Sequence, residues 1–153
     1  MHRATVVHAP LVEAFEFFAN AANLERLTPA WLRFSIRTAM PVVMRAGVEI
    51  EYRLRLYGVP IRWVSVIDVW EPGVRFVDRQ VTGPYVSWRH EHRFEPAGDD
   101  VTRVVDEVEY VPRAAWITGR FVRRDVERIF SYREHALQRI FAPSGSPTPR
   151  DCA

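Results

Sequence analysis

The stretch VEIEYRLRL, residues 48–56, decides the fold because its side chains alternate between two kinds. Apolar or aromatic side chains stand at Val48 and at every second position up to Leu56, whereas Glu or Arg occupies each position between them. Successive side chains of a β-strand point to opposite faces of a sheet. The alternation therefore predicts a strand with one buried face and one solvated face.

Four more strand-like segments follow, separated by short turn sequences. They span residues 61–70, 74–81, 85–94 and 101–111, with turns at GVP (58–60), PG (72–73), GP (83–84) and AGDD (97–100). Connections this short join antiparallel neighbours. Residues 34–111 are therefore predicted to form a meandering antiparallel sheet, which residues 3–8 extend as a short first strand.

Helical periodicity appears on both sides of this sheet region. Pro10 suits the first position of a helix, a short helical turn is predicted at residues 24–27, and residues 116–141 have the period of a long helix. The long helix has a stripe made of Val122, Val126, Ile129, Phe130, Arg133, Leu137 and Ile140. Such a stripe must be buried against the sheet. The sequence thus predicts one α+β domain at residues 1–142, with a curved antiparallel sheet of about six to seven strands around a long C-terminal helix.

Turn lengths predict which residues lie opposite one another in the sheet. One row on the inner face consists of Ile50, Ile67, Asp78, His90 and Asp106. The flanking rows consist of Tyr52, Ser65, Gln80, Trp88 and Val108 on one side, and of Val48, Val69, Phe76, His92 and Val104 on the other. The outer face carries mainly Glu and Arg, which indicates a solvated surface.

A polar strip crosses this otherwise apolar inner face. It consists of Asp78, Gln80, His90, His92 and Asp106, with Arg133 of the long helix above it. Apolar walls with a few convergent polar groups are typical of small-molecule sites. A histidine held by a carboxylate can exchange a proton near neutral pH, which makes His90 with Asp106 or Asp78 a candidate catalytic pair. In the alternative interpretation these charges only satisfy one another in the interior.

The strip also contains a His-x-His pair, His90 and His92, on one face of a strand, as in the metal sites of cupins. His8 or Asp106 could complete a ligand set. The glycine-rich segment ending in histidine that completes the cupin pattern is missing. We therefore expect no metal and no cofactor, with less than one zinc, iron or manganese ion per chain.

Composition narrows the possible partners. With 21 basic and 19 acidic residues the formal net charge is +2, which favours neither nucleic acid nor an anionic membrane as a partner. Cys152 is the only cysteine, which fits a reducing compartment. No apolar run approaches the ~20 residues of a membrane span, so a cytoplasmic protein without stable membrane insertion is expected. Residues 143–153, PSGSPTPRDCA, are predicted to be a disordered tail.

The order of elements resembles the helix-grip fold of the START-like (SRPBCC) superfamily, which includes polyketide cyclase/dehydrases and lipid-transfer proteins. The runs FVDRQVTGPYVSWRHEHRF (76–94), DEVEYVP (106–112) and FSYR (130–133) are similar to bacterial ligand-binding members, and the resemblance covers residues 3–141. It implies a cavity between sheet and helix for a lipid, polyketide-like or aromatic ligand. The candidate ligand-binding residues are Tyr52, Leu54, Trp63, Gln80, Trp88, His90, His92, Tyr110 and Arg133.

Three functions stay open at this point. The protein could bind a small hydrophobic molecule, or it could be a cyclase/dehydrase-type enzyme with His90 as general acid or base. It could also be an interaction module whose inner face, including the aromatic residues, is plain core. Cavity volume separates the third function from the other two, since useful pockets measure about 300–1,000 Å³. The sequence specifies no oligomeric state.

Overall fold

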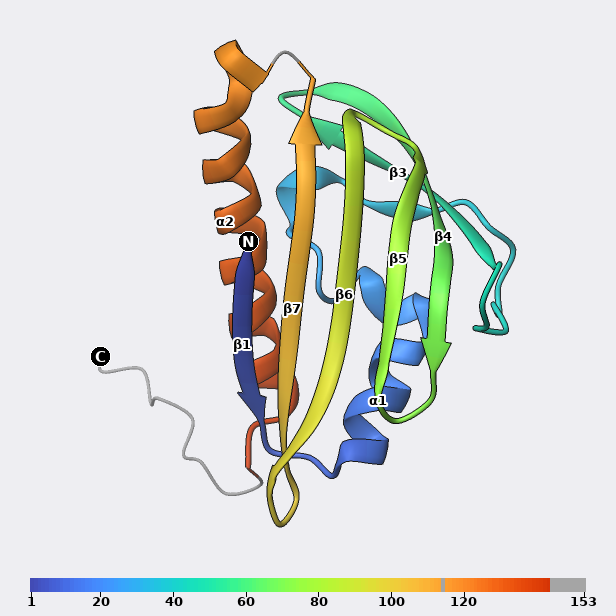
Figure 1. Ribbon diagram of the computed structural model, residues 1–153, viewed down its shortest axis with the longest axis vertical. Helices are drawn as coiled ribbons and strands as arrows, with labels where there is room; N and C mark the ends of the chain where they lie inside the picture. The colour runs from blue at the N-terminus through green and yellow to red at the C-terminus, as the bar shows by residue number, and fades with distance from the viewer. Residues whose placement is uncertain (114, 144–153) are drawn as a thin grey trace, which may run out of the picture.

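The computed structural model describes residues 1–113 and 115–143 (Figure 1). Its elements are β1 (His2–Val7), α1 (Leu11–Ala19), the 3₁₀ helices η1 (Ala21–Leu24) and η2 (Ala30–Leu32), β2 (Ser35–Ile36), β3 (Glu49–Leu56), β4 (Val59–Glu71), β5 (Arg75–Thr82), β6 (Tyr85–Gly98), β7 (Val101–Pro112) and α2 (Ala115–Ile140). The tail predicted at residues 143–153 lies outside the described residues, apart from Pro143. No helix in the described part of the chain is long and apolar enough to cross a membrane.

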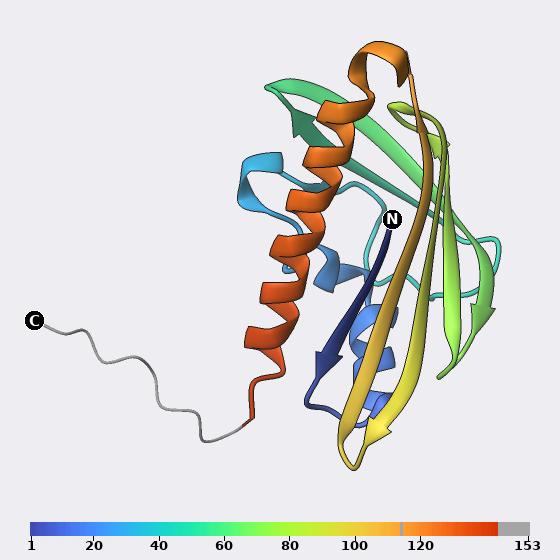
Figure 2. The ribbon, with the colours of Figure 1, turned by 60° about the vertical axis from the view of Figure 1, so that its left-hand side comes forward.

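All strands belong to one antiparallel sheet of seven strands in the order β1-β7-β6-β5-β4-β3-β2. Figure 2 shows the sheet curving around α2, with the segment that links α1 to β3 on the same side. The predicted α+β helix-grip fold is therefore confirmed. The short turns make successive strands pair from β3 to β7, and the first strand, β1, adds an edge to the sheet by pairing with β7.

The helix α2 is continuous, and its predicted stripe faces the sheet. Val126, Phe130 and Leu137 are buried on the side facing the sheet. Burying a large apolar side chain contributes about 1.5–3 kcal/mol. This stripe therefore holds the helix across the concave face.

Aromatic side chains of α1 pack against the concave face of the sheet. The ring centroid of Phe15 lies 5.1 Å from that of Phe94, and the centroid of Phe18 lies 5.2 Å from the same ring. Both contacts are edge-to-face, which is a favoured aromatic geometry. The core is therefore closely packed around Phe94.

The hairpin between β3 and β4 is shifted by two residues from the predicted register. Its turn consists of Tyr57 and Gly58, with φ angles of 51° and 82°, one residue earlier than predicted. A two-residue hairpin turn of this type needs positive φ at both positions, which sequence rules assign to glycine or asparagine and not to tyrosine. Ile50 consequently lies opposite Ser65, and the predicted pairing with Ile67 is wrong.

The pairing of β6 with β7 is also shifted by two residues. Val108 lies opposite His90, whereas Asp106 lies opposite His92, because the turn begins after Gly98 and is not centred on it. The predicted direct pairing of His90 with Asp106 is therefore wrong. A shift of two residues preserves the face of every side chain, so the histidines and Asp106 still point to the concave side.

Between β4 and β5 the predicted pairing is correct next to the polar strip, because the effects of two irregularities on the register cancel there. Ile67 lies opposite Asp78, as predicted, but the loop is one residue longer than expected and β4 has a bulge between Ile67 and Val69. Beyond the bulge the strand exchanges faces, so Trp70 lies opposite Phe76 where Val69 was expected. Bulges of this kind give no clear sequence signal.

Candidate functional site

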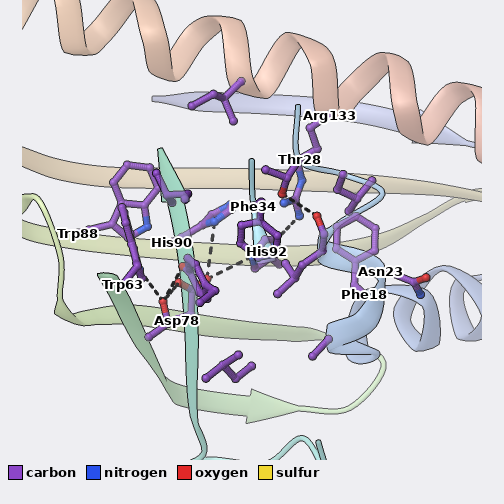
Figure 3. A pocket seen from close by; sticks show the side chains of 18 of the residues that line it. Phe18, Asn23, Thr28, Phe34, Trp63, Asp78, Trp88, His90, His92 and Arg133 are labelled. Carbon is purple, nitrogen blue, oxygen red and sulfur yellow. Dashed lines mark hydrogen bonds and ion pairs between the residues drawn. The ribbon is translucent and has the colours of Figure 1, made fainter. Parts of the chain in front are cut away.

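A cavity of about 190 Å³ lies between the concave face of the sheet, α2 and the segment linking α1 to β3 (Figure 3). Its apolar lining includes Leu24, Leu27, Leu32, Phe34, Ile50, Tyr52, Leu54, Trp63, Ile67, Trp88, Val126, Ile129 and Phe130. The volume is below the range of about 300–1,000 Å³ that suits drug-sized ligands. It exceeds the roughly 150 Å³ that holds one benzene molecule. The cavity therefore has room for one compact molecule.

Most of the candidate residues line this cavity. They are Tyr52, Leu54, Trp63, Asp78, Trp88, His90, His92 and Arg133. Gln80 and Tyr110 are not among its described lining residues. The Gln80 amide instead donates a hydrogen bond to the carbonyl oxygen of Tyr85 at 3.0 Å, and the Tyr110 ring packs 5.7 Å from the ring of Trp88.

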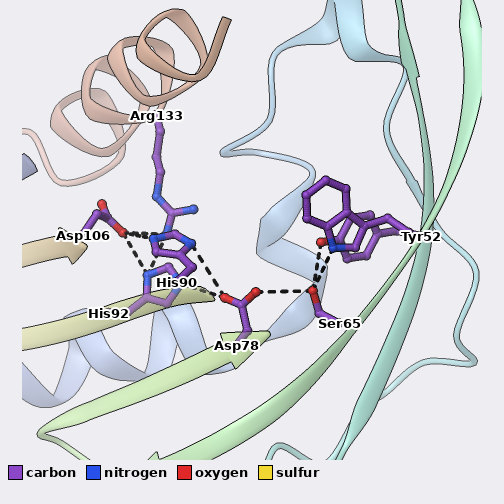
Figure 4. Close-up of polar contacts among 8 residues, drawn as sticks. Tyr52, Ser65, Asp78, His90, His92, Asp106 and Arg133 are labelled. Atoms are coloured by element: carbon purple, nitrogen blue, oxygen red, sulfur yellow. Dashed lines mark hydrogen bonds and ion pairs between the residues drawn. The ribbon is translucent and has the colours of Figure 1, made fainter. Parts of the chain in front are cut away.

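Two imidazoles on β6 share one carboxylate oxygen of β7 (Figure 4). His90 Nε2 and His92 Nδ1 each lie 2.9 Å from Oδ1 of Asp106. The two ring centroids are 3.7 Å apart. The carboxyl group of Asp106 is 2 % exposed, so both contacts are fully inside the protein.

Asp78 on β5 lies on the other side of the imidazoles. Its Oδ2 atom is 3.7 Å from His90 Nδ1 and 3.4 Å from His92 Nε2. Its Oδ1 atom accepts a hydrogen bond from the Ser65 hydroxyl at 3.3 Å. The Asp78 side chain keeps 16 % exposure because it faces the cavity, which makes it the most accessible carboxylate of the strip.

Ser65 connects Asp78 to the aromatic wall. Its hydroxyl oxygen accepts a hydrogen bond from Trp63 Nε1 at 3.0 Å and lies 3.2 Å from the hydroxyl of Tyr52. The Tyr52 and Trp63 rings are stacked at 17°. One serine therefore fixes both rings relative to the carboxylate.

Arg133 closes the strip from α2, as predicted. Its NH2 atom lies 3.2 Å from His92 Nδ1 and 3.6 Å from Asp106 Oδ1. The guanidinium also stands over the rings of Phe18 and Phe130, at 5.0 and 5.9 Å from their centroids. Its Nε atom is buried without a hydrogen-bond partner among the described residues.

Burial sets the protonation of this cluster. It lowers the pKa of His90 to about 4, and the neighbouring His92 acts in the same direction against the pull of Asp106. Burial alone would raise the pKa of Asp106, but Arg133 and the two imidazoles hold it well below the ordinary value. Asp78 also has a lowered pKa, because contacts with His92 and His90 outweigh its burial. At neutral pH His90 is uncharged and both carboxyl groups are ionised.

Sequence reasoning missed several parts of the site. Ser65 was placed in the correct row, but nothing in the alternation singled out its central position. The residues of η1 and η2 that line the cavity carry no periodic pattern long enough to place them. Asp78 was not considered as a third partner for a metal, yet its carboxylate and the two imidazoles of His90 and His92 place one ligand atom each within 4.8 Å of one another.

The sheet, the long helix and the cavity between them define a protein of the α+β helix-grip fold class. Within that class the chain belongs to the family described as a domain of unknown function, DUF8410, whose model matches residues 23–141. No curated protein matches the chain in sequence.

Solved structures of the same fold come from organisms as different as bacteria and ginseng. Protein CV1439 from Chromobacterium violaceum is 13% identical, with 94% of this chain and 96% of that chain covered and a TM-score of 0.72. The Zhui aromatase/cyclase from a Streptomyces species is 18% identical over 95% and 98% of the two chains, with a TM-score of 0.69. The ginseng (Panax ginseng) major latex-like protein 151 is 11% identical over 94% and 97%, with a TM-score of 0.68. The TM-scores establish a shared fold, and at identities this low the similarity extends to the fold alone.

Proposed function

We propose that this protein binds one compact, mainly apolar molecule, of the size of a substituted aromatic ring, in the cavity between the sheet and α2. The observation that carries the proposal is the cavity of about 190 Å³, which is walled mainly by aromatic and aliphatic side chains and also contains the polar groups of Asp78, His90 and His92. An interaction module would have filled this space with its own side chains. The modest volume favours a small aromatic or polyketide-like ring system over a long-chain lipid.

The polar strip suggests how such a molecule is oriented. The Asp78 carboxylate and the uncharged His90 ring both line the cavity, and both offer hydrogen-bond acceptors. A ligand that carries a hydroxyl donor at one end satisfies them, while its apolar body packs against Leu54 and Ile129. Leaving a buried acceptor unpaired costs about 1–3 kcal/mol, so a donor on the ligand also determines specificity.

Calorimetric titration with para-ethylphenol and ethylbenzene tests the proposal. One molecule of para-ethylphenol per chain should bind, more tightly than ethylbenzene, which lacks the hydroxyl donor. Leu54→Trp fills the cavity and should abolish binding, whereas Val81→Trp, on an exposed position of β5, should leave it intact. Equal binding by the wild type and by a folded Leu54→Trp protein would rule the cavity out as the binding site.

A cyclase/dehydrase-type enzyme is the second candidate, because His90 is oriented by Asp106 beside a cavity in a fold shared with an aromatase/cyclase. The pKa of about 4 weighs against it. A general base works best with a pKa near the operating pH, and His90 is therefore a weak base at neutrality. Conversion of a linear polyketone thioester by the wild type, but not by Asp78→Asn, would favour the enzyme over the binding protein.

A further inference from the structure

Three electron-rich atoms converge at the polar end of the cavity. They come from Asp78, His90 and His92, which each place one possible ligand atom within 4.8 Å of the others; the atoms nearest Oδ2 of Asp78 are Nδ1 of His90 and Nε2 of His92. The carboxylate oxygen is 3.7 Å from the first nitrogen and 3.4 Å from the second. The two histidines come from one face of β6, and Asp78 lies directly opposite His90 on β5.

Contacts with Asp106 determine which nitrogen of each imidazole ring faces Asp78. Its Oδ1 atom lies 2.9 Å from His90 Nε2 and 2.9 Å from His92 Nδ1. The Nε2 atom of His90 donates a hydrogen bond to Asp106. The Nδ1 atom of His92 lies between Asp106 and Arg133, and it carries the proton toward Asp106 when Nε2 ligates a metal. The Arg133 NH2 atom, 3.2 Å from the same His92 nitrogen, then acts as the ion-pair partner of Asp106 at 3.6 Å. A carboxylate behind an imidazole is the usual outer partner of a metal-ligating histidine.

In that form Nδ1 of His90 and Nε2 of His92 carry lone pairs, and a cation bound between them would also contact Oδ2 of Asp78. The other oxygen of Asp78 is held by Ser65 at 3.3 Å, which leaves Oδ2 free to act as a ligand. We infer that Asp78, His90 and His92 form a binding site for a divalent first-row transition metal of the zinc or iron class, with Asp106 as the outer partner of both imidazoles.

The dimensions and the donor types fit this class of metal. Metal–ligand distances of about 2.0–2.2 Å place neighbouring donor atoms roughly 3.0–3.4 Å apart, so the 3.4 Å contact needs no change and the 3.7 Å contact a small closure. Two imidazoles and one carboxylate with open positions are typical of catalytic zinc and of non-haem iron(II). Phe76 stacks on His92 at 4.2 Å between centroids, which gives the site an apolar shell.

The open coordination positions face the cavity, and the charge count indicates what they accept. Asp78 and Asp106 contribute two negative charges and Arg133 one positive charge. A divalent ion therefore leaves the cluster with a net charge of +1, which an anionic oxygen such as hydroxide or a phenolate neutralises. In the competing arrangement the Nε2 proton of His92 takes the place of the metal: Nδ1 of His92 accepts from Arg133, and Nε2 donates to Asp78.

A cobalt(II) titration distinguishes metal from proton. Full-length protein is stripped with a chelator and titrated with Co²⁺ without any organic ligand, so the result does not depend on the proposed apolar ligand. We expect visible cobalt absorption that saturates at one ion per chain and is displaced by Zn²⁺. Asp106→Asn should weaken binding by roughly 10–100-fold and Asp78→Asn by more than that. Asp68→Asn should have no effect, because that carboxylate pairs with Arg79 on the outer face.

A second measurement needs no variant and so covers the case in which Asp78→Asn does not fold. Nitrogen-15 NMR of the histidine rings in the wild type, with and without Zn²⁺, should shift Nδ1 of His90 and Nε2 of His92 while the other nitrogen of each ring keeps its proton. Absence of saturable metal binding would overturn the inference. Binding that moves neither of these two nitrogens would overturn it as well.

Discussion

The Nε2 atom of His90 lies 2.9 Å from Oδ1 of Asp106, although the residue directly opposite His90 on β7 is Val108. The contact is diagonal across the ladder, and diagonal neighbours are still within reach of long side chains. Asp106 is directly opposite His92, so a single carboxylate serves both imidazoles. The whole polar strip depends on this arrangement.

Removing Asp106 should therefore destabilise the fold strongly. Asp106→Ala leaves Arg133 and two imidazole N–H groups without their buried acceptor, and breaking such a set costs about 3–5 kcal/mol. For a chain of this size, that corresponds to a fall of roughly 6–20 °C in Tm. Calorimetric melting of chelator-treated protein checks it.

Glu107→Ala is the matched control for this prediction. The residue is adjacent in sequence but lies on the outer face, where it pairs with Arg93 at 3.5 Å, and exposed pairs contribute about 0–1 kcal/mol. Equal melting temperatures of the two variants would show that the strip is not a cooperative unit.

Ser65→Ala should loosen the aromatic wall of the cavity. The substitution leaves Trp63 Nε1 and Asp78 Oδ1 without their shared partner, which costs about 1–3 kcal/mol when the groups are buried. Urea unfolding measures the loss, and the tryptophan emission should change because the ring loses its hydrogen bond. Ser87→Ala, at an exposed position of β6, should change neither. An unchanged unfolding free energy in Ser65→Ala would contradict the role given to this hydroxyl.

The sequence predicted the fold well because the face on which a side chain lies changes only when the strand register is shifted by an odd number of residues. Both hairpin shifts are by two residues, so they left the side chains on their predicted faces even where the partners changed. The part of β4 beyond its bulge, by contrast, exchanged faces. The exact pairings were beyond reach because Tyr57 adopts a positive φ, which sequence rules reserve for glycine, and because the bulge near Val69 leaves no trace in the alternation.

The candidate site could be predicted only in part for a related reason. Strand alternation placed His90, His92 and Asp78 on the concave face, and helical periodicity placed Arg133 above them. The segment with η1 and η2 forms one wall of the cavity, and its position is determined by tertiary packing rather than by local pattern. Gln80 was predicted to bind ligand, but its side-chain amide is hydrogen-bonded to the backbone of Tyr85 instead.

The tip of the β3–β4 hairpin should move more freely when its contact with α2 is removed. The hydroxyl of Tyr57 donates to the carboxylate of Asp125, and this hydrogen bond raises the pKa of the exposed Tyr57 phenol. Tyr57→Phe should therefore speed amide hydrogen exchange in residues 55–60 at neutral pH, with little change in Tm. Unchanged exchange in this peptide would show that other contacts hold the hairpin.

The same contact predicts a pH dependence. Because the pKa of Tyr57 is raised in the folded protein, its contribution to stability is fully present below the ordinary tyrosine value of about 10 and is lost as the pH rises through the folded value. The small difference in urea midpoint between wild type and Tyr57→Phe should be constant at lower pH and disappear above it. A difference that persists in strongly alkaline solution would contradict this assignment.

The proposed binding of a compact apolar molecule between sheet and helix is tested most directly by isotope-filtered NMR of the protein with para-ethylphenol. We predict nuclear Overhauser effects from the phenol ring to the methyl groups of both Leu54 and Ile129, which line the cavity from β3 and from α2. Contacts confined to the exposed Val81 and Val86, or no saturable contact at all, would contradict the account.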